Sequence, residues 1–270
     1  MDNIRVSVIM AVYNSDFSKL KRAVNSILNQ TYSDIEFVIC DNASTNGTFE
    51  FLKNIEDHRI VLMKNNENMG QTYSLNRCLN IARGEYIARM DDDDISENDR
   101  IEKQVTFLDE HPEYGIVGCN SWLIDNNGIW GESIMPEYPC KKDLLFTVTH
   151  LHPSIMVRKS ELLKINGYRD LKRTRLCQDY DLYMRLYASG VRAYNIQDKL
   201  FYYNQTSQTF LKRTFKERFN EVICRYEGFR LLGLYPVGFL YLLKPLVAFF
   251  IPNNIKQRRL ERKYGVNKNK

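Results

Sequence analysis

The chain has 270 residues, of which 44% are hydrophobic and 26% are charged, and this composition is that of a folded globular protein and argues against a disordered one. The length allows one large α/β domain, or such a domain with a short appendage. The net charge of +5 is concentrated in the tail from residue 253, where seven lysines and arginines face one glutamate, so the rest of the chain is nearly neutral and we expect no nucleic-acid partner.

Strands and helices alternate over the first ninety residues. The predicted strands are nearly unbroken apolar runs at 6–12, 35–40, 60–63 and 85–90. Between them, apolar residues recur at helical spacing over 20–28, 49–55 and 70–82. Strands that are hydrophobic throughout are typical of a sheet covered on both faces. The order βαβαβαβ therefore predicts a doubly wound, mostly parallel sheet of the Rossmann-like type with right-handed crossovers.

Each predicted strand is followed by a polar side chain that can meet a ligand. In strand order, these residues are Tyr13 with Asn14, Asp41, Asn65 with Asn66, and Asp91. Parallel α/β sheets bind their ligands at the carboxyl ends of the strands. We therefore expect these side chains to converge on one edge of the sheet.

The pattern changes after Asp94. Ser96 and Asp99 resemble a capping box, with Asp in place of the usual Glu, and predict a helix that continues through Leu108. Residues 116–130 predict a hairpin that turns near Asn127-Gly128. The remaining predicted elements are strands at 155–157 and 200–203 and a helix at 179–188. No repeat or low-complexity linker interrupts them, which favours one domain with two halves.

The run Asp91-Asp92-Asp93-Asp94 is the strongest chemical signal in the chain. Blocks of like charge are usually solvated surface loops, and that reading remains open. However, four carboxylates directly after a buried strand repel one another at a sheet edge unless a cation offsets their charge. Carboxylate oxygens together with a substrate diphosphate are the ligands that Mg²⁺ and Mn²⁺ prefer. We therefore favour a metal site over a solvated loop.

In the order and spacing of its motifs, the sequence resembles glycosyltransferase family 2, the inverting class with the GT-A fold. The resemblance extends from Val6 to about Thr209. The motifs that carry it are VIMAVYN (8–14), SILNQTY (26–32), DNASTNGT (41–48), NMG (68–70), LN (75–76), ARGEYIARMDDDD (82–94), HPS (152–154), GY (167–168) and QDYDL (178–182). Each motif alone is weak, whereas the whole series is specific.

The resemblance implies where the donor binds. Asp91 and Asp93 would be the Asp-x-Asp element, which holds Mn²⁺ or Mg²⁺ against the donor diphosphate. Asp41 would accept a hydrogen bond from the base, uracil or thymine, and Tyr13 would pack near it. Asn42 departs from the second Asp that is common in the family. The nucleotide-sugar-binding positions implied in this way are Ala11, Tyr13, Asn14, Asp41, Asn68, Asn76, Asp91 and Asp92.

The resemblance also implies a catalytic base. Asp179 occupies the base position of the family, and Gln178 stands where a Glu is usual. Acids at a helix N-terminus also interact favourably with the helix dipole, so a purely structural role is the alternative, and it is our preferred role for Asp181. A positioned carboxylate that takes the proton of an acceptor hydroxyl accelerates transfer by about 10²–10⁴-fold. We expect a single displacement with inversion, and disfavour glycoside hydrolysis by paired carboxylates.

Four further positions have weaker predicted roles. His152 belongs to an acceptor-side or linker motif and is more often structural in such positions. Lys212 and Arg213 could close over the diphosphate, although a solvated loop is the simpler interpretation. Asn204 weakens the lid assignment, because related sequences often have Arg there.

The C-terminal segment has the composition of a membrane-surface anchor. Residues 234–251 are apolar but are interrupted by Pro236, Gly238 and Lys244-Pro245, and a spanning helix needs about 20 apolar residues. A basic tail follows, and basic segments are attracted to anionic lipid headgroups. We therefore expect peripheral membrane contact through 234–270. Packing of this segment against the main domain, or a true membrane span, are the alternatives.

The cysteines and the N-terminus indicate the compartment. The six cysteines form no Cys-x-x-Cys pair and several lie in apolar runs, so we expect free buried thiols, without disulfides or zinc. No apolar signal segment precedes Val6. We therefore expect a cytoplasmic protein associated peripherally with the inner face of the plasma membrane.

These expectations combine into one function. A hexosyl- or N-acetylhexosaminyl-type transferase (EC 2.4) would move sugar from a UDP- or dTDP-sugar to a glycan or lipid-linked glycan acceptor in capsule, O-antigen or exopolysaccharide biosynthesis. The GT-A domain would span 1–212, with a nucleotide-binding half at 1–94 and an acceptor-binding half at 95–212, and a helical appendage would span 213–270.

Two other functions remain open at this point. A sugar-phosphate nucleotidyltransferase would normally carry a glycine-rich basic loop after the first strand, where this chain has residues 14–17, Asn-Ser-Asp-Phe. A catalytically inactive membrane-bound scaffold is the second alternative. The intact Asp91, Asp93 and Asp179 argue against it.

Overall fold

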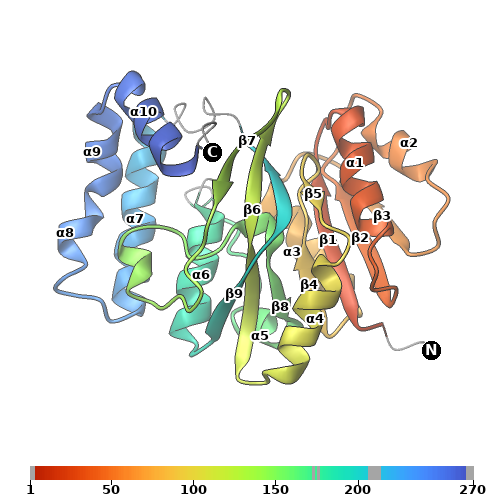
Figure 1. The fold of residues 1–270 in the computed structure, drawn as a ribbon, viewed down its shortest axis with the longest axis horizontal. Coiled ribbons are helices and arrows are strands. Elements are labelled where there is room, and N and C mark those ends of the chain that lie inside the picture. The colour runs from red at the N-terminus through yellow and green to blue at the C-terminus, as the bar shows by residue number, and fades with distance from the viewer. Residues whose placement is uncertain (1–3, 172–173, 175–176, 206–213, 266–270) are drawn as a thin grey trace, which may run out of the picture.

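The computed structural model describes residues 4–171, 174, 177–205 and 214–265. A twisted, nine-stranded mixed sheet lies at its centre, and helices cover both faces of the sheet (Figure 1). The last helices of the chain lie at the end of the molecule opposite the first helices (Figure 1).

The first half of the chain forms the parallel part of the sheet. Its strands are β1 (Val6–Val12), β2 (Ile35–Asp41), β3 (Ile60–Lys64) and β4 (Tyr86–Arg89). The helices between them are α1 (Phe17–Leu28), α2 (Thr48–Lys53) and α3 (Gln71–Ile81). β1 pairs in parallel with β2 and β4, and β3 extends the sheet beside β2. Every residue of β1 and β2 is buried, as the apolar runs predict.

The second half of the chain extends the same sheet with strands of both directions. Its elements are β5 (Ile95–Ser96), α4 (Arg100–Glu110), β6 (Tyr114–Asp125), β7 (Gly128–Ser133), the 3₁₀ turns η1 (Asp143–Leu145) and η2 (His152–Ser154), β8 (Met156–Arg158), α5 (Lys159–Lys164), α6 (Gln178–Ala188) and β9 (Arg192–Asn204). The sheet order is β3-β2-β1-β4-β8-β6-β9-β5, with β7 paired to β6. β8 runs antiparallel to both of its neighbours, whereas β6 and β9 are parallel. The predicted hairpin is confirmed as β6 and β7.

The predicted capping box is wrong, although the helix that follows it is confirmed. Ser96 lies in the short strand β5, because its segment pairs with Phe201 of β9. The helix α4 begins only at Arg100, and its N-cap Asp99 makes no side-chain capping bond. The Ser96 hydroxyl instead accepts hydrogen bonds from Nε of Arg100 at 2.7 Å and from Gln30 at 3.2 Å. Strand pairing with a distant segment therefore overrides the local capping signal.

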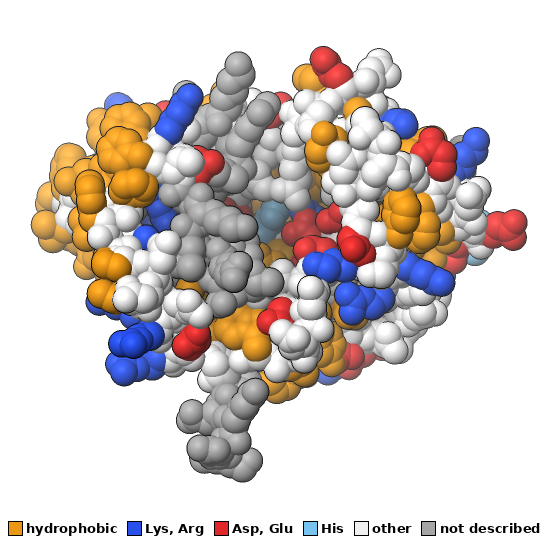
Figure 2. All heavy atoms as spheres, turned by 90° about the horizontal axis from the view of Figure 1, so that it is seen from above, with side chains coloured by type: hydrophobic (Ala, Val, Ile, Leu, Met, Phe, Trp, Pro, Cys, Tyr) orange, Lys and Arg blue, Asp and Glu red, His pale blue; other side chains and the backbone are white. Residues whose placement is uncertain are grey.

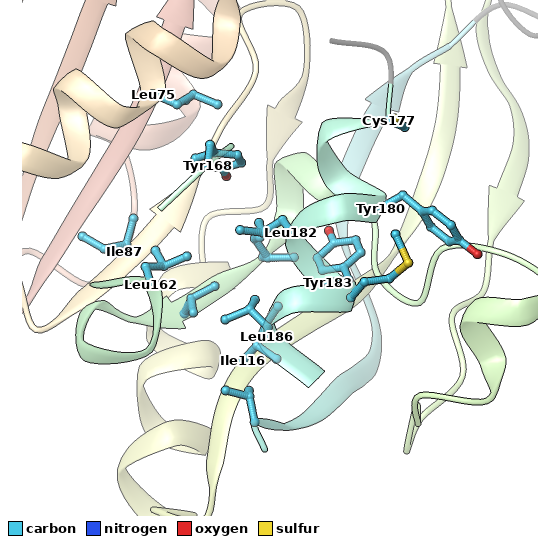
Figure 3. Close-up of a cluster of buried hydrophobic side chains, with 14 of the residues drawn as sticks. Leu75, Ile87, Ile116, Leu162, Tyr168, Cys177, Tyr180, Leu182, Tyr183 and Leu186 are labelled. Atoms are coloured by element: carbon cyan, nitrogen blue, oxygen red, sulfur yellow. The ribbon is translucent and has the colours of Figure 1, made fainter. Parts of the chain in front are cut away.

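The two faces of the sheet have separate hydrophobic cores. One core joins β1 and β2 to α1 and α4, and includes Leu20, Val24, Ile101 and Val105. The other core joins the opposite face to α3, α5, α6 and α7. In Figure 3, Leu182 and Leu186 of α6 point toward side chains from the sheet and from α3 and α5. The N-terminus of α6 is thereby held against the sheet.

Residues 214–265, the last that the structure describes, contain four helices. They are α7 (Phe215–Leu231), α8 (Phe239–Leu242), α9 (Lys244–Phe250) and α10 (Asn253–Tyr264). α7 begins with a capping box between Thr214 and Glu217, and packs against α6 and α9. α10 lies beside β7, where Gly265 forms an isolated bridge to Gly131. Of the helices that the structure describes, none combines the length and hydropathy that a transmembrane segment needs.

None of the six cysteines, all of which lie in described residues, forms a disulfide. Five of them are buried, and Cys140 is exposed.

Candidate active site

Two loops hold Asp41 at the carboxyl ends of β1 and β2. Asp41 is buried, and its carboxylate accepts hydrogen bonds from the backbone amide and the hydroxyl of Ser44. The Ser44 hydroxyl oxygen also accepts a bond of 2.9 Å from the backbone amide of Asn14, which adopts a φ of 48°. Lys64 Nζ lies 3.9 Å from Asp41 Oδ2. The acid that we expect to meet the base is therefore fixed in orientation by its own loop.

Of the other predicted donor-binding residues on this side, Tyr13 is exposed, whereas the Asn76 amide is already hydrogen-bonded at both ends. Tyr13 is 47% exposed at the end of β1, while Ala11 is buried within the strand. Asn76 uses both ends of its amide on the backbone of Tyr168, donating at 2.8 Å and accepting at 2.8 Å. Its side chain therefore braces the turn at 167–168, and its contact with a donor remains a prediction.

Asn42, where the family commonly has a second Asp, connects the loop after β2 to the segment 65–69 after β3. Its Oδ1 accepts from Asn65 Nδ2 at 2.8 Å and from the backbone amide of Met69 at 3.0 Å. Its Nδ2 donates to Asn68 Oδ1 at 2.7 Å. An ionised carboxylate has no proton for this last bond. The amide therefore places Asn68, a predicted donor-binding residue, at the edge of the site.

The first two acids of the tetrad have partners from separate parts of the chain. Asp91 Oδ1 accepts from Arg89 Nη2 at 2.5 Å and from Gln71 Nε2 at 3.1 Å. Arg89 is almost completely buried in β4, so its guanidinium orients this carboxylate from below the sheet edge. Asp92 accepts from the hydroxyl of Ser15, in the loop after β1. The two strand-end loops are thus linked through these acids.

The last two acids are linked through Asn204, at the end of β9. Its side chain donates to Asp93 Oδ2 at 2.8 Å, and its backbone amide donates to Asp94 Oδ1 at 2.7 Å. Asp94 is fully buried, and its Oδ2 has no hydrogen-bond partner in the described residues. Burial, followed by repulsion among the neighbouring carboxylates, raises the pKa of Asp93 and Asp94. Burial also raises the pKa of Asp92 to about 6. The charge of Arg89, which pairs with Asp91, therefore offsets only part of the negative charge of the four acids.

This cluster fits a divalent cation that shares its ligands with a substrate. In the part of the chain that the structure describes, no three His, Cys, Asp or Glu side chains converge to hold a metal ion. Among the described residues, the hydrogen bonds to these two acids fall on Oδ1 of Asp91 and Oδ2 of Asp93, which leaves the other oxygen of each carboxylate for a cation. Mg²⁺ is commonly bound by one or two carboxylates together with substrate phosphates, and needs no complete protein cage.

Asp179 lies at the N-terminus of α6, the position predicted for the base. Its Oδ1 accepts a bond of 2.8 Å from the backbone amide of Tyr180. The preceding residue, Gln178, donates through Nε2 to Oε1 of Gln71 in α3. Because Gln71 also donates to Asp91, two amides connect the start of α6 to the loop after β4.

Tyr203 of β9 lies between the two groups of acids. Its pKa is raised by burial and then by the carboxylates of Asp94, Asp91, Asp179 and Asp93, all of which are close enough to act on one phenol. Figure 2 shows acidic side chains gathered in a hollow near the middle of this face. The acids after β4 and the candidate base on α6 therefore face a common space, although they are separated by more than eighty residues of sequence.

His152 and Asp181, which belong to two of the family-like motifs, make contacts typical of structural residues. Burial and the charge of Arg89 lower the pKa of His152 to about 3, and its Nε2 lies 3.0 Å from the Tyr168 hydroxyl, so it is a neutral, packed histidine. Asp181 pairs with Arg185 at 2.7 Å, which agrees with the structural role that we prefer for it.

Three site residues escape the sequence analysis. Ser15 follows a strand, and the same rule that selects Asn14 could have selected it. Gln71 and Tyr203 have no such signal, because their contacts join distant parts of the chain. Lys212 and Arg213, which could form a lid, lie outside the described residues.

Comparison with known proteins places this site in a family. The model of glycosyl transferase family 2 matches residues 7–165. EpsE of Bacillus subtilis (strain 168), assigned as a glycosyltransferase, is 38% identical over 257 residues, which cover 94% of this chain and 92% of that protein. The beta-1,3-glucosyltransferase WfaP of Escherichia coli is 29% identical over 220 residues, covering 70% of this chain and 80% of WfaP.

Solved structures show the same fold at low identity. S. aureus TarS 1-349 in complex with UDP-GlcNAc has a TM-score of 0.66 at 16% identity, covering 86% of this chain and 71% of that chain. The mannosyltransferase PcManGT of Pyrobaculum calidifontis, in complex with GDP-Man and Mn²⁺, has a TM-score of 0.61 at 18% identity, covering 94% and 72%. The fold is therefore GT-A, and the chain belongs to glycosyl transferase family 2.

Proposed function

We propose that this transferase moves a sugar from a nucleoside diphosphate donor, a UDP- or dTDP-sugar, to an acceptor hydroxyl with inversion at the anomeric carbon. The observation that carries the proposal is the pair of hydrogen bonds by which Gln71 contacts Asp91 and Gln178, because these bonds hold the acids after β4 near Asp179. A donor diphosphate held at Asp91 and Asp93 would then present its sugar toward Asp179.

The residues of the chain divide the reaction between binding and proton transfer. Asp41 and Tyr13 would bind the base, and Asn14 and Asn68 would line the path to the diphosphate. A divalent cation, when bound, would neutralise the charge that develops on the departing diphosphate. Asp179 would take the proton of the acceptor hydroxyl as it attacks, a contribution of about 10²–10⁴-fold to the rate.

The acceptor that we propose is a lipid-linked glycan, in the assembly of a surface polysaccharide. WfaP, by its description, acts on alpha-D-GlcNAc-diphosphoundecaprenol, and another similar protein, WbnJ of E. coli, is an O-antigen biosynthesis glycosyltransferase. We assign donor binding to residues 1–94, acceptor binding to 95–212 and membrane contact to the appendage at 213–270. The protein would then work at the inner face of the plasma membrane.

The surface of the appendage supports membrane contact. Leu240 is 82% exposed, Phe250 75% and Val247 62%, all on α8 and α9. Figure 2 shows hydrophobic side chains gathered at the end of the molecule that these helices occupy. The adjacent helix α10 carries five basic residues and one acid. Apolar side chains beside a basic helix complement a membrane with anionic headgroups.

A donor screen tests the proposed reaction. The full chain is incubated with a panel of UDP- and dTDP-sugars and Mn²⁺, and nucleoside diphosphate release is measured. We expect release with at least one donor, its loss in EDTA, and its loss in Asp93→Asn and in Asp179→Asn with unchanged thermal unfolding. Asp198→Asn, which removes an exposed acid outside the site, is the matched control and should behave as the wild type.

Other outcomes would contradict the proposal in recognisable ways. Release of pyrophosphate instead of a nucleoside diphosphate would indicate nucleotidyl transfer. Full activity in Asp93→Asn would show that the diphosphate does not bind at the acids after β4. Neither donor binding nor turnover, with a folded protein, would indicate an inactive scaffold.

A further inference from the structure

A cavity of about 670 Å³ extends from the candidate active site to the C-terminal helices. Asp179 and Tyr203 belong to its lining, and so do Arg218 and Arg225 of α7 and Lys244 of α9. The acids Asp91–Asp94, where the donor diphosphate is proposed to bind, are not among its lining residues. The candidate base therefore borders a second compartment, one that the appendage helps to close.

The appendage gives this compartment an excess of positive charge. Among the cavity-lining residues of α7 and α9, the acid is Glu221, and it lies 3.4 Å from Arg218 and 3.3 Å from Arg225. Both arginines therefore contact the same carboxylate. Lys244 Nζ donates to the backbone carbonyl of Phe146, a neutral group. Burial and then repulsion from Arg225 and Lys263 lower the pKa of Lys244, as expected where cations outnumber acids.

Packing against neighbouring side chains fixes the orientation of the two arginines in the cavity. Arg225 keeps only 7% of its side chain exposed, and its guanidinium lies over the ring of Tyr180, 4.8 Å from the centroid. Tyr180 directly follows Asp179 on α6. Arg218 is also largely buried, with 14% of its side chain exposed. Guanidinium groups oriented by packing are suited to bidentate binding of phosphate oxygens.

The outer side of the same helices is apolar. Pro245 and Ala248 of α9 line the cavity, while Val247 and Phe250 of the same helix are exposed on the outside. A ligand with its anionic group in the cavity could therefore lay a hydrocarbon chain along α9. This geometry fits a lipid-linked anion better than a soluble sugar phosphate.

On the basis of the proposed function, we propose that this cavity binds the acceptor, with Arg218, Arg225 and Lys244 holding the diphosphate that joins its sugar to a lipid. The sugar next to the diphosphate would then reach Asp179 with one of its hydroxyls. The appendage would be part of the acceptor site itself, in addition to any membrane contact that it makes.

Equilibrium binding tests the site without catalysis. Farnesyl diphosphate, which carries a diphosphate and a prenyl chain but no sugar, is titrated against the full chain in EDTA. EDTA prevents metal-dependent binding of the diphosphate at Asp91 and Asp93. We expect binding to the wild type, weakened about 10- to 100-fold in Arg218→Gln/Lys244→Gln, because hydrogen bonds to charged groups are lost. The charge-matched control is Lys53→Gln/Lys164→Gln, two exposed lysines outside the cavity.

The choice of probe separates the contribution of the lipid chain to binding affinity from that of the phosphates. Farnesol should bind far more weakly than farnesyl diphosphate, and inorganic pyrophosphate should bind with intermediate affinity. Equal affinity of wild type and Arg218→Gln/Lys244→Gln for farnesyl diphosphate would overturn the assignment of the cations. Equal affinity for pyrophosphate and farnesyl diphosphate would overturn the assignment of a lipid-linked ligand. Lys244→Gln alone, at an exposed position, provides a second variant if the pair does not fold.

Kinetics with acceptors distinguish failure of this inference from failure of the proposed function. If the wild type releases no nucleoside diphosphate from any donor, the proposed function fails. The equilibrium binding experiment still tests whether the cavity binds a prenyl diphosphate. If transfer occurs, the KM of a phosphate-free prenyl glycoside is divided by the KM of the corresponding diphosphate acceptor in each protein. This ratio should fall about tenfold or more in Arg218→Gln/Lys244→Gln and stay constant in the control.

Discussion

Two asparagines explain how this chain departs from the pattern of its family. Asn42 replaces a common Asp, and its amide makes a donor bond to Asn68 that an ionised Asp could not make. Asn204, where an Arg is frequent, donates to Asp93 and Asp94 from its side chain and backbone. At both positions, a neutral amide donates a hydrogen bond to a neighbouring side-chain oxygen without adding charge to the site. A cationic lid residue at 204 is therefore not needed to orient these acids.

A buried acid outside the active site supports the start of β2. Glu36 is 1% exposed and accepts bonds from Ser7 at 2.6 Å and from the backbone and side chain of Arg83 at 2.6 and 2.8 Å. Burial alone raises the pKa of Glu36, but these hydrogen bonds outweigh it, and the net pKa is lowered. A lowered pKa in the folded state adds stability above the unfolded pKa, about 4.3, and this stability is lost as the pH falls through the folded value.

We therefore predict that Glu36→Gln destabilises the protein at pH 7 by about 1.5–3 kcal/mol, because a charged acceptor of several hydrogen bonds is lost. The difference from the wild type should shrink below about pH 4, where Glu36 itself becomes protonated. Urea unfolding at several pH values measures both effects. Glu56→Gln, at an exposed position, should change stability little at any of these pH values. A difference that is constant down to pH 3 would contradict the pKa argument.

At the scale of elements, the site depends on α3 and α6 being held over the same edge of the sheet. α3 contributes Gln71 and α6 contributes Gln178, and the bond between them crosses the boundary between the two halves of the chain. The side chains of α6 that point into the core, shown in Figure 3, keep its N-terminus in this place. Catalytic geometry therefore rests on helix packing as much as on the loops themselves.

The connection from α3 to β4 passes close to the backbone of β1, and only a glycine at position 84 fits there. A Cβ at Gly84 would lie 2.4 Å from the backbone nitrogen of Ser7 and 2.7 Å from the carbonyl carbon of Val6. We predict that Gly84→Ala costs at least about 1–3 kcal/mol, because a strand backbone must move. At Gly228, by contrast, the added Cβ would meet the end of the flexible Met184 side chain.

Thermal unfolding of Gly84→Ala and Gly228→Ala checks this prediction. Gly84→Ala should have the lower melting temperature, and Met184→Ala should relieve the strain of Gly228→Ala but not that of Gly84→Ala. Similar melting temperatures for the two glycine variants would show that β1 can shift without cost.

At the scale of the whole molecule, the appendage joins the sheet to an apolar outer surface. α7 packs against α6 on its inner side, and α8 and α9 expose Leu240 and Phe250 on the outer side. The proposed acceptor cavity lies between these two surfaces. A membrane-bound substrate could thereby reach Asp179 without leaving the membrane surface completely.

We predict that the full chain binds vesicles of phosphatidylcholine with phosphatidylglycerol more tightly than vesicles of phosphatidylcholine alone. Salt should weaken the difference, because basic residues near a charged membrane contribute about 1 kcal/mol each and are screened. Leu240→Asp/Phe250→Asp should reduce binding roughly tenfold or more, since two large apolar side chains no longer enter the interface. Vesicle sedimentation measures both effects.

Ile81→Asp, at an exposed position on α3, is the control for adding a negative charge and should bind as the wild type does. Equal binding of Leu240→Asp/Phe250→Asp and the wild type would show that α8 and α9 do not form the membrane-binding surface.

Sequence alone determined the parallel half of the fold and the sheet edge at which polar side chains gather. Strands buried on both faces leave a local signature of continuous apolar residues, and parallel pairing places their ends at one edge. The same signature places Asp41 and Asp91 at that edge. The resemblance to a family added Asp179, which no periodicity could identify as a base.

Tertiary structure alone decided which distant residues meet. The position of Ser96 in a strand, the bond between Gln71 and Gln178, and the bonds from Asn204 to the acids all join segments more than sixty residues apart. Such contacts depend on how whole helices and strands pack, and local periodicity carries no information about them. The cavity beneath α7 and α9 is of the same kind, because its charges come from a segment whose sequence indicated only an anchor.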